Sequence, residues 1–135
     1  MNKGDYPNGS TYYDSPTTGA NMTNLKNFTL GKFVGEEVAD NERYVLKDNN
    51  ALENLTVSHT SLKPNQETRG HKHDGIDEVY IFSEGHGRIQ LDEYIIPVEK
   101  GSVILIPGGV FHKVYNDSWN NRLEFMCVLQ GRRGH

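Results

Sequence analysis

Four residues stand at a spacing that could hold a metal ion: His71, His73, Glu78 and His112. In an extended strand, residues i and i+2 point to the same face, so both rings of the His-x-His pair can reach one ion. The intervening loop 74–77 can return Glu78 to the same place, and His112 can arrive from a neighbouring strand. Three imidazoles and a carboxylate suit Mn, Fe, Co, Ni or Zn, and a six-coordinate ion would keep two positions open for water or substrate. The sequence therefore predicts one divalent transition-metal site with open coordination.

Other residues of the same types compete for this role less well. Asp77 is an alternative to Glu78, but it lies on the opposite face if the strand already begins there. His59, His86 and His135 are lone histidines, which are more often surface or hydrogen-bonded residues than ligands. By contrast, a barrel interior that held three imidazoles and a carboxylate without an ion would carry a heavy desolvation cost.

The elements that must position these residues read as β-strands. Apolar and polar residues alternate from Leu55 to Thr60, as in a half-buried strand, and both faces of Glu78 to Ser83 are apolar or aromatic, as in a strand covered on both sides. Further short strands are expected within residues 25–34, 43–46, 88–92, 94–98, 102–106, 113–115 and 123–129. No amphipathic helix of normal length is indicated, so we predict an all-β sandwich or closed barrel.

Turn-forming residues separate these strands. We predict turns at Asp48-Asn49-Asn50 and Gly85-His86-Gly87, and the acidic pair Glu36-Glu37 interrupts the first apolar stretch. The segment Lys63-Pro64-Asn65-Gln66 suits a type II turn, because Pro fits its second position and Asn tolerates the positive φ of its third.

The length of 135 residues fits one domain with its own core. Residues 1–24 carry few aliphatic side chains and predict a mobile arm, which leaves residues 25–135 for the barrel domain. A second interpretation stays open, in which Tyr6, Tyr12 and Tyr13 dock the arm on a partner subunit.

Charge and composition limit the partners. A formal net charge of -4 argues against nucleic acid or an anionic membrane and favours a small-molecule substrate. With no signal segment, no apolar run of bilayer length and a single cysteine, the sequence reads as a soluble cytoplasmic protein. Cys127 reads as a core thiol rather than a nucleophile. Strands that are apolar on both faces leave an outer surface to cover, so we expect a homodimer.

The chain resembles the cupin superfamily, whose small jelly-roll β-barrels usually hold a divalent metal ion. The first motif of that family (His-x-His, three or four residues, Glu, six residues, Gly) is matched by His71, His73, Glu78 and Gly85. The second (Gly, five residues, Pro-x-Gly, two residues, His, three residues, Asn) is matched by Gly101, Pro107, Gly109, His112 and Asn116. One departure is Asn65, where the family usually has Gly. The resemblance implies a single-domain jelly-roll barrel and covers about residues 55–129.

A narrower likeness is to the cupin-type sugar-phosphate isomerases, whose pattern is matched by Gly70, His71, His73, Glu78, Tyr80, Gly85 and Gly87. This likeness implies a metal-dependent sugar or sugar-phosphate isomerase or epimerase, with Glu78 and Tyr80 as the candidate catalytic residues that move a proton between neighbouring carbons. Arg69 and Gln90 are the candidate ligand-binding residues. Arg69 shares the parity of His71 and His73 and could hold a phosphate or carboxylate, although a solvated charge in a loop is an equal alternative.

Two other functions stay open, because cupins perform many reactions on one fold. The first is an Fe(II)-dependent dioxygenase, in which the open positions take dioxygen and a chelating substrate. The second is a non-catalytic protein that binds a small ligand or a metal.

Overall fold

The structure, a computed structural model, describes residues 27–133, so the predicted arm at residues 1–24 and His135 lie outside the described residues. The described chain contains nine strands and no helix, which confirms the predicted all-β class. The strands are β2 (Glu36–Asp40), β3 (Tyr44–Asn49), β4 (Leu55–Leu62), β5 (Glu78–Glu84), β6 (His86–Leu91), β7 (Tyr94–Glu99), β8 (Val103–Ile106), β9 (His112–Asn116) and β10 (Leu123–Gln130). A search of the same residues finds no helix that could span a membrane.

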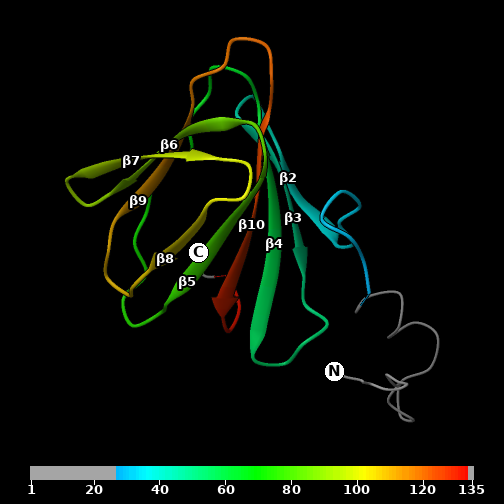
Figure 1. The fold of residues 1–135 in the computed structure, drawn as a ribbon. Helices are drawn as coiled ribbons and strands as arrows, with labels where there is room; N and C mark the ends of the chain where they lie inside the picture. Colours follow the sequence, from blue (N-terminus) through cyan, green and yellow to red (C-terminus); the bar gives the residue numbers. More distant parts are fainter. Residues whose placement is uncertain (1–26, 134–135) are drawn as a thin grey trace, which may run out of the picture.

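The strands form two antiparallel sheets that face each other (Figure 1). One sheet has six strands in the order β2-β3-β4-β10-β5-β8, and the other has three in the order β7-β6-β9. Because the sheet orders are not the chain order, strands distant in sequence become neighbours: β10 pairs with both β4 and β5. This is the jelly-roll arrangement that the sequence predicted.

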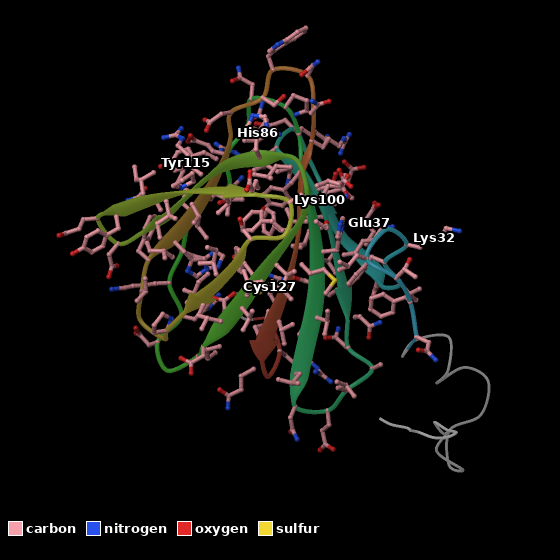
Figure 2. The ribbon with its side chains drawn as sticks, viewed as in Figure 1. Lys32, Glu37, His86, Lys100, Tyr115 and Cys127 are labelled. Atoms are coloured by element: carbon pink, nitrogen blue, oxygen red, sulfur yellow. The ribbon has the colours of Figure 1, made fainter. Side chains whose placement is uncertain are left out.

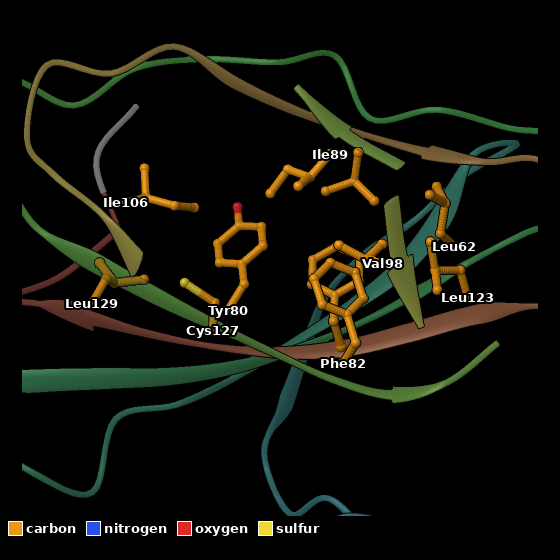
Figure 3. Packing of buried hydrophobic residues seen from close by; sticks show 11 residues of the cluster. Leu62, Tyr80, Phe82, Ile89, Val98, Ile106, Leu123, Cys127 and Leu129 are labelled. Carbon is orange, nitrogen blue, oxygen red and sulfur yellow. The ribbon is translucent and has the colours of Figure 1, made fainter. Parts of the chain in front are cut away.

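The core lies between the two sheets. The larger sheet contributes Leu62, Phe82 and Phe125, and the smaller sheet contributes Ile89 and Val114, all at most 2% exposed (Figure 3). The inward positions on β5 and β10 alternate with outward ones, as the two-residue period of a strand requires. Side chains that line the barrel interior are therefore separated by one residue along each strand.

The predicted type II turn agrees with the backbone. Asn65 adopts a φ of 62°, and the Gln66 amide donates a hydrogen bond to the Lys63 carbonyl at 3.2 Å. This explains why Asn can stand where the family usually has Gly, since a short polar side chain tolerates the left-handed region.

Two local predictions near the site were wrong. Residues 71–73 form no strand and contain only the isolated bridge from His71 to His112. His86 and Gly87 do not form a turn with Gly85 but begin β6.

Three predictions for the first part of the chain were also wrong. Glu36 and Glu37 do not interrupt the sheet but begin β2, where the exposed edge accommodates their charges. Asp48 and Asn49 are not in a turn but end β3, buried at 6% and 8% exposure. Within residues 27–34, no extended strand forms and the sole pairing is the bridge between Thr29 and Lys32.

The outer surface retains apolar side chains on the edge strands. Tyr94 on β7 is 69% exposed, and Val103 and Leu105 on β8 are 57% and 69% exposed. The homodimer inferred from the sequence stays a prediction.

Candidate metal centre

Main-chain hydrogen bonds join the two segments that carry the predicted ligands. The amide of His71 donates to the carbonyl of His112 at 3.0 Å, and the amide of His112 donates back at 2.9 Å. The Gly109 amide donates to the carbonyl of His73 at 2.8 Å. Asp77, the competing carboxylate, accepts a hydrogen bond from the Gly108 amide at 2.9 Å, so its side chain ties the two loops together.

The four predicted ligands converge. The Nε2 atoms of His71 and His112 lie 3.0 Å apart, and Oε2 of Glu78 lies 3.2 Å from Nε2 of His112. Nε2 of His73 lies 3.8 Å from Oε2 of Glu78. One ligand atom each from His71, His73 and Glu78 falls within a mutual distance of 4.8 Å.

These distances and donor types fit a transition-metal ion. Neighbouring ligands at right angles, each about 2.1 Å from one ion, are separated by about 3.0 Å, as the two imidazoles are. Nδ1 of His112 lies 3.1 Å from the Val110 carbonyl oxygen. With an ion in the site, Nδ1 would donate its proton to this carbonyl and Nε2 would present its lone pair to the ion in place of its present contact with Glu78, as in histidines that bind metals.

The charge states of the cluster also suit a cation. Burial lowers the pKa of His71 to about 4, and the neighbouring His112 and His73 add to this effect, so His71 is neutral at pH 7. Burial alone would raise the pKa of Glu78, but its hydrogen bond and charge interaction with His112, and a hydrogen bond from Cys127, together hold that pKa below its ordinary value. A neutral imidazole thus faces an ionised carboxylate.

An interior cavity of about 280 Å³ adjoins the cluster. His71 and Glu78 line it, together with Tyr80 and Cys127. The Cys127 thiol donates to Oε1 of Glu78 at 3.2 Å, and burial, followed by the nearby Glu78 charge, raises the pKa of that thiol well above its usual range. Cys127 therefore stays protonated, which agrees with the prediction that it is not a nucleophile.

Tyr80 presents a polar group to this cavity. The residue is 6% exposed, and its hydroxyl, which points into the space enclosed by the buried side chains in Figure 3, has no hydrogen-bond partner among residues 27–133. Burial raises the pKa of Tyr80 well above its ordinary value, so the hydroxyl is a donor at neutral pH. A buried hydroxyl without a partner is costly, which makes it a candidate contact for a bound ligand.

The two predicted ligand-binding residues differ in their placement. Arg69 lines the interior cavity, and the structure shows no hydrogen bond or ion pair of its side chain with any other described residue. Gln90 is not brought to the site: its Nε2 donates to the Asp92 carbonyl at 2.8 Å and its Oε1 accepts from Tyr115 at 2.9 Å. On β6 the buried position belongs to Ile89, so Gln90 faces outward.

The lone histidines lie elsewhere. His59 faces away from the barrel interior, with its Nε2 3.2 Å from Glu124 and its ring stacked on Phe33. His86 is exposed at the start of β6, and Figure 2 shows it well apart from Cys127.

Sequence reasoning missed one residue of this region, Arg133. Its guanidinium forms two hydrogen bonds with Asp48, at 2.9 and 2.8 Å, and lines the interior cavity. The predicted turn at Asp48 gave no reason to expect a buried carboxylate that needs a cation, so the sequence offered no direct signal for Arg133.

Comparisons with known proteins agree with this geometry. The family described as Cupin domain matches residues 58–131. An uncharacterized protein of Methanocaldococcus jannaschii is 27% identical over 107 residues, which cover 71% of this chain and 85% of that protein.

Two solved structures show how widely the same fold is used. A predicted oxalate decarboxylase from Thermotoga maritima is 20% identical with a TM-score of 0.63, and the match covers 77% of this chain and 97% of that one. A candidate sugar phosphate isomerase from Acidithiobacillus ferrooxidans is 21% identical with a TM-score of 0.59, and the match covers 66% of this chain and 60% of that one. At these identities the likeness shows the fold alone. The family match spans more than half of the chain and contains the four converging residues, so this protein belongs to the cupin family.

Proposed function

We propose that this cupin binds a divalent transition-metal ion and isomerises or epimerises a small sugar or sugar phosphate. The observation that carries the proposal is the shared cavity: His71, Glu78 and the unpartnered Tyr80 hydroxyl line one interior space of about 280 Å³. That volume suits a small metabolite rather than a polymer. The solved structure of a candidate sugar phosphate isomerase with the same fold supports the choice of reaction.

His71, His73, Glu78 and His112 are the residues that would hold the ion, which when bound would supply Lewis-acid polarisation of a substrate carbonyl. Tyr80 donates a hydrogen bond from Oη to the substrate oxygen on which charge develops. Glu78 accepts a proton from one carbon and returns it to the neighbouring carbon. Its Oε1 is suited to this because its contact is the Cys127 thiol, a weak donor that a substrate can displace.

The decisive test is turnover with a defined metal content. The purified protein is stripped with a chelator, reloaded separately with Mn, Fe(II), Co, Ni or Zn, and incubated with a panel of aldose and ketose phosphates while the sugars are followed by NMR. We expect metal-dependent interconversion of at least one pair. Glu78→Gln should abolish it, and Tyr80→Phe should lower kcat about tenfold or more while metal content is retained.

Other outcomes would overturn the proposal. Absence of turnover in every fully loaded form refutes an isomerase. Oxygen uptake confined to the Fe(II) form would replace the isomerase with a dioxygenase, and sugar binding without any turnover would replace it with a non-catalytic binding protein.

A further inference from the structure

Arg133 has no part in the reaction proposed above, yet it occupies a defined position beside the site. A second cavity, of about 560 Å³, lies at the mouth of the barrel and is lined by residues that include His71 and His73. Four residues line both this mouth and the interior cavity: Tyr44, Leu46, His71 and Arg133. These four residues border both cavities, and we call the region between them the throat.

The guanidinium of Arg133 is fixed in this throat. Nε donates to Oδ2 of Asp48 at 2.9 Å and Nη2 donates to Oδ1 at 2.8 Å. Asp48 is 6% exposed and belongs to β3, so it anchors the arginine on the barrel wall. A guanidinium held along its Nε–Nη2 edge still presents its Nη1 and Nη2 donors on the adjacent edge. Nη1 of Arg133 has no partner among the described residues.

The charges around the cavity favour an anion. Glu78 and Asp48 supply two negative charges, and Arg69 and Arg133 supply two positive charges. The charges of these four side chains therefore cancel. Any divalent ion held by the imidazoles adds positive charge that these residues do not compensate. A small ligand with its own negative charge would restore the balance.

We propose that Arg133, oriented by Asp48, is an anion anchor that binds the carboxylate or phosphate of the substrate at the throat. The bound group lies beside His71, and the uncharged part of the ligand extends inward toward Tyr80. Arg69 lines the same interior cavity and contributes a second cation. The inference rests on the proposed function for its choice of substrate, but the anchor itself is tested by binding alone.

Three ligands that share a vicinal diol but differ in charge test the anchor: glycerol 3-phosphate and glycerate are anions, and glycerol is neutral. Their affinities for the metal-loaded full chain are measured by calorimetry, and arginine side-chain signals are followed by ¹⁵N NMR. We expect both anions to bind more tightly than glycerol and to shift the Arg133 signal. The tighter of the two identifies whether the site prefers phosphate or carboxylate.

The variant that tests the anchor is Arg133→Met combined with Asp48→Asn, because this pair leaves no buried unpaired charge. We expect it to weaken anion binding about 10- to 100-fold, with glycerol binding and metal affinity unchanged. Arg133→Lys, which keeps the charge but loses the forked geometry, should lie between this variant and the unmodified protein. The matched control is Arg132→Met, since the Arg132 guanidinium donates to the Leu55 and Asn50 carbonyls and lines neither cavity.

Anion affinity that is equal in the unmodified protein, in Arg133→Lys and in the double variant would overturn the anchor, even if sugar-phosphate turnover is found. Conversely, the protein could bind anions in a manner that depends on Arg133 and show no turnover. That result would support the proposed anion anchor and refute the proposed isomerase activity.

Discussion

The same strands build the two ends of the barrel interior, but one end is packed apolar core and the other holds the candidate site. At one end, Phe82 on β5 faces Phe125 on β10, with ring centroids 5.0 Å apart, and both rings are at most 2% exposed, although Phe125 also borders the interior cavity. Tyr80 and Cys127 face each other two residues further along these strands, and Glu78 and Leu129 face each other two residues beyond them. β5 and β10 pair across both ends, with a register shift between Glu124 and Phe125 at the closed end. At each pair of facing residues, the type of the inward side chain alone decides whether that position belongs to the core or to the candidate site.

The difference shows how the fold combines stability with function. The closed end holds Leu62, Ile89 and Leu123 with no measurable exposure, and it buries the apolar surface that stabilises the barrel. The open end keeps a cavity, an unpartnered hydroxyl and the imidazole cluster, which are features that cost stability. Substitutions at the two ends should therefore affect different properties.

The largest expected effect is at the closed end. Phe82→Ala removes a 1% exposed ring and should lower the free energy of unfolding by about 3 to 5 kcal/mol in denaturant titration, with any folded protein still binding metal. Tyr80→Phe is the matched change at the open end and should alter that free energy by less than about 1 kcal/mol, because the hydroxyl has no partner in the described chain. Equal losses in the two variants would break the comparison.

A smaller effect on the free energy of unfolding is expected at Asn116, whose side chain holds the loops next to the closed end. The amide Nδ2 of Asn116 lies 3.1, 3.1 and 2.8 Å from the carbonyl oxygens of Leu62, Lys63 and Asn121. Asn116→Ala should lower the free energy of unfolding by about 2 kcal/mol, since buried carbonyls lose their donor. The exposed Asn120→Ala should change it by less than about 0.5 kcal/mol. A loss of metal affinity in Asn116→Ala without a loss of stability would contradict a purely structural role.

The smallest effect concerns pH and the open end. The pKa of His71 is lowered to about 4, whereas an unfolded histidine titrates near 6.5, so between these values the unfolded chain binds a proton that the folded chain does not. Stability of the chelator-treated protein should thus fall as pH decreases from about 6.5 to 4. Because the ring of His71 is partly exposed, we expect a loss of about 1 kcal/mol, measured by thermal unfolding. His71→Gln should remove this share of the pH dependence, and an unchanged pH profile in that variant would show that other groups cause it.

The sequence predicted which four side chains converge better than it predicted their surroundings, for a physical reason. His71 and His73 are separated by one residue and their spacing to Glu78 and His112 matches a known pair of motifs, so the sequence names these candidates even though no strand forms at residues 71–73. The partnership of Asp48 with Arg133 is not local, because the two residues meet only when β3 and the segment after β10 are folded together. No periodicity of either segment indicates that contact.

The error at Gln90 has a different origin. Its neighbour Ile89 is apolar and alternates with polar residues on both sides, so the parity of β6 already indicated that Gln90 faces outward. The prediction assigned a function to a polar side chain without asking which face of the strand it occupies. Tyr80, which the sequence analysis named as a candidate catalytic residue, shares the parity of Glu78 on β5 and faces the interior.

The reciprocal hydrogen bonds between His71 and His112 have one more consequence. They join the segment that precedes β5 to the start of β9 through the main chain, independently of any side chain in the cluster. Most of the conformational entropy of assembling the ligands is therefore lost when the barrel folds, and little remains to be lost when an ion binds. An ion bound as proposed could therefore be exchanged for another without unfolding of the barrel, and the metal content would then follow the ions available to the protein rather than its folding history.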